Sequence, residues 1–377
     1  MVDKRKFKDV EVSLLGLGTM RLPCETEQKR ESNPNIDYEK AQKLVDLAYK
    51  NGVNYYDTAY MYHCGKSEKF IGLALKKYPR NTYFIADKLP IWMCDTKEDM
   101  QRIFANQLER TGIEYFDFYL LHSLDKENFE KCEELGAYDF IKQKQKEGKI
   151  KYIGFSFHGT VDDLRHIVSA HDWDFAQIQM NYLDWKNQNA KAQYQTLEDA
   201  NIPTIVMEPV RGGKLALVNN EIKDMFKSKK PNMSVASWAM GFVASHKNII
   251  TILSGMNSEQ QMLDNLSTLT DFKAFGDDEY SICFKAASIL NKSEVIGCTG
   301  CDYCQPCPKG IKISSFFSLY NSVVSGDVNI QQGREVYDSF AVNPTACAWC
   351  NKCKNHCPQS ISVPDVLEGK VVKLFMQ

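Results

Sequence analysis

The sequence predicts an α/β protein, a (β/α)8 TIM barrel followed by a small, mostly helical C-terminal domain. From about residue 12 to about residue 268, short apolar runs alternate with longer amphipathic stretches at intervals of about thirty residues. The length of 377 residues exceeds what a single domain of ordinary size requires. Eight of the thirteen cysteines crowd between Cys298 and Cys357, which indicates a second domain with its own chemistry.

Eight apolar runs are expected to be the barrel strands. They are rich in β-branched and aromatic residues and apolar at consecutive positions, which is typical of strands buried on both faces. The runs are VSLLGLG, VNYYDTA, TYFIADK, YFDFYLLH, KYIGFSF, FAQIQMN, TIVMEP and IITILSG. Because helices alternate with them, the sheet should be parallel. Eight units in about 260 residues fit a closed barrel better than a doubly wound sheet, although periodicity alone allows six or seven strands.

Helical segments fill the intervals between these runs. Asp37 is the expected N-cap of YEKAQKLVDLAYK, which Gly52 follows, and a second helix is expected to end at Gly112. After Ser267 the alternation stops, and the segments DDEYSICFKAASILN, FFSLYNSVVSGDVN and REVYDSF read as helices. We therefore expect a barrel domain over residues 1–280 and a helical domain over residues 281–377.

Composition excludes several classes of protein. Lys+Arg 46 against Asp+Glu 48 gives a net charge of −2, and 44% of the residues are hydrophobic, as in ordinary globular proteins. Nothing in this balance indicates a nucleic-acid partner. No stretch approaches the roughly 20 consecutive apolar residues of a membrane helix, and the charged start lacks the features of a signal peptide. The expectation is a cytoplasmic protein that does not bind a membrane.

The cysteine groups have the spacing of iron–sulfur ligands. Each group is a dense run that ends in Cys-Pro: Cys298-x2-Cys301-x2-Cys304-x2-Cys307 and Cys347-x2-Cys350-x2-Cys353-x3-Cys357. Ferredoxins take three thiolates from one run and the fourth, before proline, from the other, so two runs predict two 4Fe–4S clusters. Zinc needs only two cysteines per knuckle and gives no reason for the others. Disulfides do not suit a chain without an export signal.

One feature of the first group departs from that spacing. Two residues rather than three separate Cys304 from Cys307, so either Cys307 or Cys298 need not be a ligand, and a single cluster or an altered cluster geometry remains an alternative. Over roughly residues 290–365 the chain resembles the helical two-cluster ferredoxin domains, with about forty residues between the cysteine runs.

Polar residues at the carboxyl ends of the predicted strands are the candidates for catalysis, because barrels of this kind build their active sites there. Asp57 and Tyr62 follow the second strand, Lys88 ends the third and His122 ends the fourth. Any one of them alone would fit a structural role, such as a loop cap or a hydrogen-bonded strand end. Their joint placement on three neighbouring strand ends favours a catalytic site.

Through these motifs the chain resembles the aldo-keto reductase family. DTAxxY runs from Asp57 to Tyr62 and is followed by GKSE, Lys88 ends a strand, and LLH ends in His122. The resemblance covers roughly residues 10–268. It implies hydride transfer between a nicotinamide, NADH or NADPH, and a small-molecule carbonyl or alcohol.

The resemblance also implies a role for each of the four residues. Tyr62 would be the general acid; since an ordinary tyrosine with a pKa of about 10 exchanges protons poorly near neutrality, it needs a neighbouring ammonium. Lys88 would supply that ammonium, and Asp57 would hold it in place. His122 would donate a hydrogen bond to the substrate oxygen as negative charge develops there.

Cofactor contacts follow from the resemblance less directly. Ser156 and Gln179 fall where the family holds the nicotinamide carboxamide, and Asn181 follows Gln179 on the same strand end. Phe157 stands where the family usually has asparagine, and Met207 where an aromatic residue often stacks on the nicotinamide. The nicotinamide pocket is therefore expected to be unusual.

The loops after the seventh and eighth strands are expected to hold the pyrophosphate, since barrels of this kind bind phosphate there. The residues concerned are Arg211, Gly213, Ser254 and Gly255. The following segment, SGMNSEQQMLDNL, contains no Lys or Arg to compensate a 2′-phosphate. This favours NADH slightly, with Gln261 and Asn265 as adenosine contacts, although Arg211 or Lys214 could reach the phosphate instead.

Three interpretations of the whole chain remain open, because nicotinamides deliver electrons in pairs whereas an iron–sulfur cluster accepts one at a time. In the favoured one, the barrel reduces a carbonyl and the clusters are structural or sense redox state. In the second, the clusters pass electrons between the barrel and a ferredoxin-type partner, with a bound flavin or another two-electron group as the optional mediator. In the third, the barrel is a nicotinamide-binding regulatory module without turnover, which the intact set of four residues disfavours.

Overall fold

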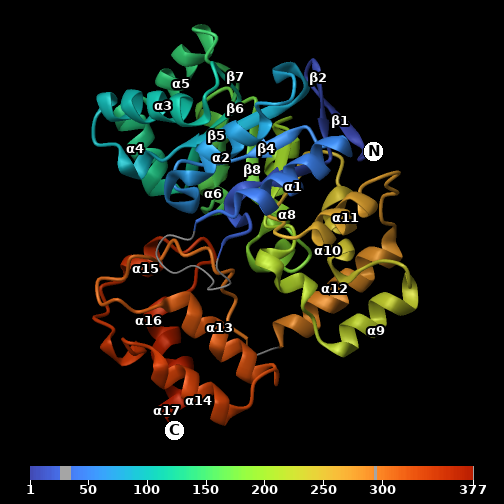
Figure 1. Ribbon diagram of the computed structural model, residues 1–377, viewed down its shortest axis with the longest axis vertical. Helices are drawn as coiled ribbons and strands as arrows, with labels where there is room; N and C mark the ends of the chain where they lie inside the picture. Colours follow the sequence, from blue (N-terminus) through green and yellow to red (C-terminus); the bar gives the residue numbers. More distant parts are fainter. Residues whose placement is uncertain (26–34, 293–294, 377) are drawn as a thin grey trace. The chain divides into compact units, whose positions relative to one another are not determined.

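A closed barrel of eight parallel strands forms the centre of the larger part of the protein in the computed structural model, which describes residues 1–25, 35–292 and 295–376 (Figure 1). The barrel runs in the order β10-β3-β4-β5-β6-β7-β8-β9. Its strands are β3 Leu15–Gly18, β4 Tyr55–Asp57, β5 Phe84–Leu89, β6 Phe116–Leu124, β7 Ile150–Phe157, β8 Phe175–Gln179, β9 Thr204–Met207 and β10 Ile249–Ser254. The predicted fold class and strand count are confirmed.

Two further strands precede the barrel and were not predicted. β1 Lys4–Phe7 and β2 Val10–Ser13 form an antiparallel hairpin, so the first apolar run divides between the end of β2 and the whole of β3. Phe7 and Val12 of the hairpin are buried in one cluster with barrel residues such as Phe118. The hairpin therefore covers an apolar part of the barrel interior.

Helices surround the barrel strands, as Figure 1 shows. They are α1 Tyr38–Lys50, α2 Lys66–Leu75, α3 Lys97–Thr111, α4 Lys126–Leu135, α5 Ala137–Lys146, α6 Val161–Ala170, α7 Asp184–Asn187, α8 Ala190–Asp199, α9 Asn220–Lys229, α10 Val235–Ala244, α11 Glu259–Thr268 and α12 Asp277–Asn291. Local sequence sets their ends. Asp37 caps α1 as predicted, accepting from the amide of Lys40 at 3.0 Å, and α3 ends at the left-handed Gly112.

The chain divides into two compact units. The first comprises Met1–Val210 and Leu215–Ala286, and the second comprises Arg211–Lys214 and Ala287–Gln377. The division falls inside α12, a continuous helix that crosses residue 281, where the sequence analysis places the boundary. Four residues of the loop after β9 thus belong to the second unit.

The second unit is helical. Its elements are α13 Ile313–Val324, α14 Ile330–Ser339, the 3-10 turn Pro344–Ala346, α15 Lys352–Asn355, α16 Val363–Val366, the π-helical turn Leu367–Val372 and α17 Lys373–Met376. Phe316 and Phe317 of α13 and Val363 of α16 contribute to its apolar core. Several cysteines pack against that core, so the thiols lie beside a hydrophobic cluster: Cys298, Cys304, Cys307, Cys347 and Cys353.

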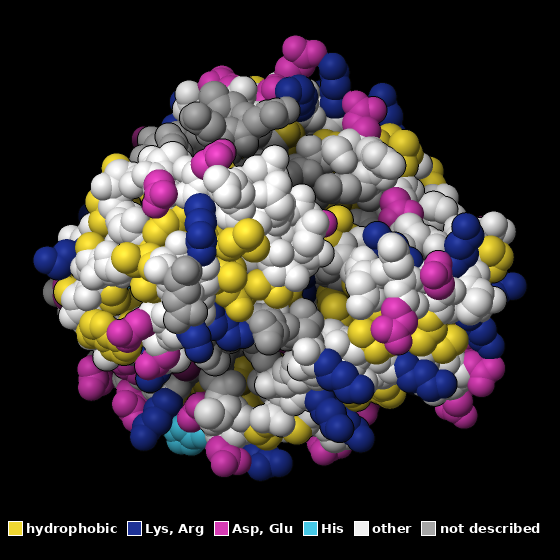
Figure 2. Space-filling model, turned by 90° about the horizontal axis from the view of Figure 1, so that it is seen from below, with side chains coloured by type: hydrophobic (Ala, Val, Ile, Leu, Met, Phe, Trp, Pro, Cys, Tyr) yellow, Lys and Arg dark blue, Asp and Glu magenta, His cyan; other side chains and the backbone are white. Residues whose placement is uncertain are grey.

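Surface charge is mixed. Figure 2 shows Lys and Arg side chains interspersed with Asp and Glu over the face in view, in keeping with the net charge of −2. Across the described ranges of the chain, no helix is both long enough and apolar enough to span a membrane.

Candidate active site

A buried ion pair joins the ends of two neighbouring strands. The register pairs Asp57 of β4 with Ala86, and Lys88 of β5 with Leu120 of β6, so three carboxyl ends adjoin. Lys88 Nζ donates to Asp57 Oδ2 at 2.6 Å and to the carbonyl of Thr58 at 2.6 Å. The Lys88 side chain is fully buried, and that of Asp57 is 4% exposed. Burial raises the pKa of Asp57, while the adjacent ammonium of Lys88 opposes that rise.

Tyr62 and His122 lie beside this pair. Tyr62 begins the 3-10 turn Tyr62–Gly65 after β4 and is half-buried. Lys88 Nζ lies 5.1 Å from the centre of the Tyr62 ring, and the Tyr62 and His122 rings are 6.4 Å apart in an edge-to-face arrangement. The structure thus brings together all four residues that the sequence singles out as catalytic candidates.

His122 is held as a neutral imidazole. It is 3% exposed, and burial lowers its pKa well below the ordinary value, with Lys88 and His158 lowering it further. Among the described residues, its buried Nδ1 has no hydrogen-bond partner. The Trp92 indole of the turn Ile91–Met93 lies 5.0 Å from the imidazole, ring centre to ring centre. His122 Nδ1 is therefore available to hydrogen-bond a polar ligand that reaches it.

Two of the three predicted nicotinamide contacts bond one buried carboxylate. Asp184 Oδ2 accepts from Gln179 Nε2 at 2.8 Å and from Asn181 Nδ2 at 2.6 Å, and Asp184 is fully buried. Ser156 Oγ accepts from the amide of Ser123, the residue after His122, at 2.7 Å. Asp184 was not a candidate in the sequence analysis, because its link to Gln179 and Asn181 is a side-chain contact that no spacing reveals.

A second ion pair near these residues was also missed. Asn181 Nδ2 donates to the carbonyl of Glu208 at 3.0 Å, and Arg21 NH2 pairs with Glu208 Oε1 at 3.1 Å. Glu208 has a φ of 55°, which bends the chain directly after β9. The signal available from sequence was the isolated acid in the apolar run TIVMEP.

The predicted adenosine contacts gather between β10 and α11. Asn265 Nδ2 donates to Ser254 Oγ at 3.0 Å, and Gln261 Oε1 accepts from the amide of Asn257 at 2.9 Å. A Cβ atom at Gly255 would lie 3.1 Å from the Arg21 side chain, so a larger residue there would crowd Arg21. Asn265 thus contacts Ser254, and Gln261 contacts the backbone of the loop between β10 and α11.

The remaining predicted pyrophosphate residues belong to the second unit. Arg211 NH2 donates to Gln359 Oε1 at 3.2 Å, and Lys214 Nζ donates to the carbonyl of Ile296. Gly213 has a φ of 95°, a left-handed conformation that favours glycine. The bonds of Arg211 and Lys214 join the loop to the cysteine-rich segment.

The cysteines fall into two neighbouring sets, of which the first combines thiols from both runs. Burial raises the pKa of the Cys304 thiol, and nearby thiols and Asp302 raise it further. One set of thiols that affect one another's pKa values is Cys298, Cys301, Cys304 and Cys357. A second comprises Cys347, Cys350 and Cys353. Within the described ranges, no three His, Cys, Asp or Glu side chains converge as ligands of one metal ion.

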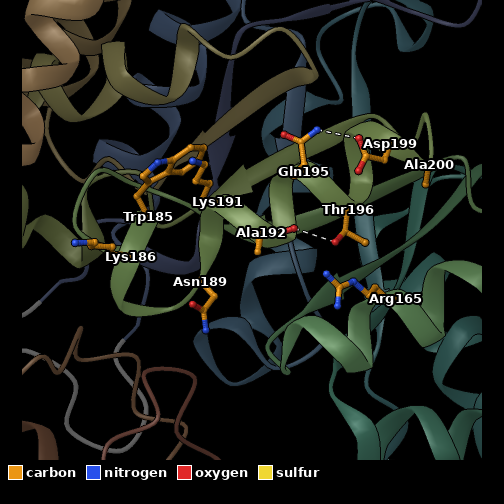
Figure 3. Close-up of a pocket in the computed structure, with 10 residues that line it drawn as sticks. All are labelled: Arg165, Trp185, Lys186, Asn189, Lys191, Ala192, Gln195, Thr196, Asp199 and Ala200. Carbon is orange, nitrogen blue, oxygen red and sulfur yellow. Dashed lines mark hydrogen bonds between the residues drawn. The ribbon is translucent and has the colours of Figure 1, made fainter.

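A separate pocket of about 760 Å³ lies on the outside of the first unit (Figure 3). Its walls come from α6, α7, α8 and the residues beside them, and none of the four candidate catalytic residues lines it. The lining residues are Arg165, Trp185, Lys186, Asn189, Lys191, Ala192, Gln195, Thr196, Asp199 and Ala200.

Comparison with known proteins identifies the class. The barrel and its relatives define an NAD(P)-dependent oxidoreductase. The chain belongs to the aldo/keto reductase family, whose model matches residues 14–287. It is 25% identical over 304 residues to the NADH-specific methylglyoxal reductase of Escherichia coli, covering 69% of this chain and 91% of the relative. It is 26% identical over 291 residues to the glyoxal reductase of Bacillus subtilis, covering 76% and 92%.

Solved structures share the barrel. A holo aldo-keto reductase from Bacillus halodurans matches with a TM-score of 0.60 at 22% identity, covering 76% of this chain and 96% of that one. An aldo-keto reductase from Klebsiella pneumoniae in complex with NADPH matches with a TM-score of 0.59 at 20% identity, covering 76% and 95%. At these identities the likeness establishes the fold. The resemblance to the family stated from sequence motifs is confirmed.

Proposed function

We propose that the barrel reduces a small carbonyl compound with NADH, using Asp57, Tyr62, Lys88 and His122. The observation that carries this proposal is the buried Asp57–Lys88 pair beneath the Tyr62 ring, beside a neutral His122. The fixed ammonium favours loss of a proton from the Tyr62 hydroxyl to the substrate oxygen. The neutral imidazole donates a hydrogen bond to the same oxygen while negative charge builds there.

The nicotinamide cofactor would supply the hydride. Gln179 and Asn181, held by buried Asp184, are rigid amides suited to a carboxamide group, and Ser156 lies on the neighbouring strand end. Ser254, Gly255, Gln261 and Asn265 are proposed for the pyrophosphate and adenosine, with Arg211 and Gly213 in the loop after β9. Phe157 and Met207 would line a more apolar nicotinamide pocket than the family usually has.

The names of the relatives point to a substrate class. Two relatives that the match covers to 91% and 92% of their own length are called methylglyoxal and glyoxal reductases, so short dicarbonyl compounds are the first substrates to test. Consumption of NADH with methylglyoxal, followed at 340 nm, should exceed consumption with NADPH. A preference for NADPH of about a hundredfold, or 2.7 kcal/mol, would contradict the NADH assignment while leaving the reductase proposal intact.

We further propose that the cysteine-rich unit carries two 4Fe–4S clusters. One would be held by Cys298, Cys301, Cys304 and Cys357, and the other by Cys347, Cys350, Cys353 and Cys307. The support is the neighbouring set that joins three thiols of the first run to the last thiol of the second. Each thiolate of such a cluster binds a different iron atom, so its ligands need not converge on one point. Amides also face the sulfurs: Gly300 donates to Cys298 Sγ at 3.3 Å.

An anaerobic absorption spectrum with iron and sulfide analysis tests the cluster proposal. About eight iron atoms per chain and a broad band near 400 nm are expected. About four would mean one cluster, and zinc without colour would discard the assignment.

The same sample tests a second function, electron transfer to a ferredoxin-type partner with a flavin as mediator. The two cysteine sets favour it because paired clusters suit stepwise electron transfer. Bleaching of the 400 nm band by NADH, together with bound flavin, would place the clusters on the electron path. A colour that NADH leaves unchanged would support carbonyl reduction alone. NADH binding without turnover of any carbonyl would favour the regulatory interpretation.

A further inference from the structure

The loop after β9 carries two cations into the cysteine-rich unit. Arg211 and Lys214 flank Gly212 and Gly213, whose φ values of 65° and 95° fold the loop back sharply. Arg211 is 9% exposed and bonds Gln359, two residues after Cys357. Lys214 is half-buried and bonds the carbonyl of Ile296, two residues before Cys298. Both cations are thus fixed next to a cysteine.

These two cysteines belong to a single proposed cluster, although they come from different runs. Lys214 interacts electrostatically with Cys298, and Arg211 with Cys357. A Cβ atom at Gly297, beside Cys298, would lie 3.3 Å from Arg211 NH2. The Arg211 guanidinium is therefore close to Cys298 as well as to Cys357.

In the second set, Cys353 is flanked along α15 by Lys352 and Lys354, whose side chains are exposed to water. The buried Arg211 and the half-buried Lys214 therefore lie next to the first set, whereas the lysines beside Cys353 are solvated.

A cation in this position changes how readily a cluster accepts an electron. Reduction adds one negative charge to a site that already carries four thiolates, and the reduction potential depends on net charge, hydrogen bonds and solvent exposure. Because Arg211 is buried and Lys214 half-buried, water and salt screen their charges less than they screen an exposed lysine. Asp302 lies near Cys298 and Cys304 and opposes the two cations.

We propose that Arg211 and Lys214 raise the reduction potential of the cluster held by Cys298, Cys301, Cys304 and Cys357 above that of the second cluster. This inference rests on the proposed clusters and adds the role of the loop after β9. The two clusters then differ in reduction potential because Arg211–Lys214, which follows β9 in the chain, places positive charge beside the first cluster. At equilibrium, the first electron that enters the unit therefore reduces the cluster next to Arg211.

The test is a redox titration of the anaerobic full-length protein, followed by electron paramagnetic resonance. Arg211→Gln and Lys214→Gln are each expected to make reduction of the higher-potential cluster about tenfold less favourable, which is about 59 mV for one electron. Asp302→Asn should shift the same cluster in the opposite direction. Lys373→Gln removes the same charge from an exposed position of α17 in the same unit and serves as the matched control.

The outcomes separate this inference from the cluster proposal. A wild-type protein without iron would refute the clusters themselves. If Arg211→Gln and Lys214→Gln leave the reduction potentials the same as in the Lys373→Gln control, the inference is overturned and the cluster proposal stands. The same holds if the potentials of both clusters shift by equal amounts. If Arg211→Gln loads no iron, Lys214→Gln and the charge-preserving Arg211→Lys carry the test. Since the same loop is also proposed to contact the pyrophosphate, the Kd for NADH, measured for each variant, reports that role separately.

Discussion

At the residue scale, Lys88 has little freedom to move. Its ammonium is bound by a carboxylate and a carbonyl, each at 2.6 Å, in a position with no exposed surface. A charge held this way costs no reorganisation when the substrate reacts. The ammonium on which the proposed role of Tyr62 depends is therefore fixed in position by Asp57 and the carbonyl of Thr58.

Replacement of Tyr62 by Phe tests the proton donor. We expect kcat/KM for carbonyl reduction to fall by about 10²–10⁴-fold, the usual contribution of a general acid, while the Kd for NADH stays within a few-fold. Tyr78→Phe is the control, because the Tyr78 hydroxyl bonds Asp46 rather than any of the four site residues. Tyr62→Phe turnover at the wild-type rate would remove Tyr62 from the mechanism.

The ion pair can be tested for stability and activity together. Lys88→Met leaves the buried Asp57 carboxylate unpaired and should destabilise the protein by about 3–5 kcal/mol. Adding Asp57→Asn should recover most of that stability, since neither charge then remains buried. Activity should stay lost in the double variant. Denaturant unfolding of the three proteins measures the first effect and NADH consumption the second; recovery of activity by the double variant would contradict the role of Lys88.

His158 predicts an acid-sensitive stability. Burial lowers its pKa to about 4, so the folded protein resists a proton that the unfolded chain accepts below about 6.5. The contribution of His158 to the free energy of unfolding is therefore fully present above about pH 6.5 and is lost as the pH falls towards 4. The expected loss between about pH 7.5 and about pH 5 is about 2 kcal/mol. Urea unfolding of wild type and His158→Gln at both pH values measures it, and an equal loss in the two proteins would refute the assignment.

Sequence motifs identified Asp57, Lys88 and His122 near strand ends, and Tyr62 in the turn that follows one, because each belongs to a recognisable local pattern. Asp184 carries no such pattern. Its importance arises from contacts with Gln179 and Asn181, and these depend on how the chain turns after β8. Arg21 and Glu208 are 187 positions apart, and their pairing likewise follows only from closure of the barrel.

At the scale of elements, α2 and α3 pack unusually closely at one glycine. A Cβ atom on Gly72 of α2 would lie 1.9 Å from the carbonyl oxygen of Thr111, the last residue of α3. The obstacle is backbone, which cannot rotate away as a side chain can. The glycine therefore sets the distance between the two helices beside β4 and β5.

Gly72→Ala should thus destabilise the protein by about 3 kcal/mol or more, the upper range for overpacking. Gly369→Ala is the control, since within the described structure no atom lies within 4 Å of the Cβ position there. Thermal unfolding of the two variants against wild type gives the comparison. A Tm of Gly72→Ala equal to that of Gly369→Ala would show that the helices can separate without cost.

The barrel strands were predictable because each is a short run of consecutive apolar residues between helices. The hairpin was not, because β1 and β2 are four residues each and mostly polar. Their pairing depends on burial of Phe7 and Val12 in the barrel core, which is a tertiary effect. The same contact explains why VSLLGLG belongs to two strands.

At the scale of the whole molecule, the sequence predicts two domains but not that the second is discontinuous. The four residues RGGK read as a glycine-rich phosphate loop, but in the structure they belong to the C-terminal unit, where they bond Gln359 and Ile296. Loop membership of this kind is decided by long-range contacts, which local spacing does not encode.

Truncation tests the discontinuity. A chain that ends at Asn291 keeps α12 but removes the partners of Arg211 and Lys214. Trypsin, which cuts after Arg and Lys, should then cleave at these residues, whereas the full-length chain should resist there because Arg211 is buried. Cleavage at other sites serves as the internal reference. Equal resistance in both chains would show that the loop holds its conformation alone.

The position of Arg211–Lys214 in the chain also limits how the second unit can be lost, exchanged or transplanted as a single piece. A module appended at the end of a chain can usually be lost or exchanged by cutting the gene at one place. Here a four-residue portion is encoded more than seventy codons upstream of the rest, between two barrel elements. A transplant of residues 287–377 onto another barrel would therefore need that short insertion as well, and the two stretches are expected to vary together among related genes.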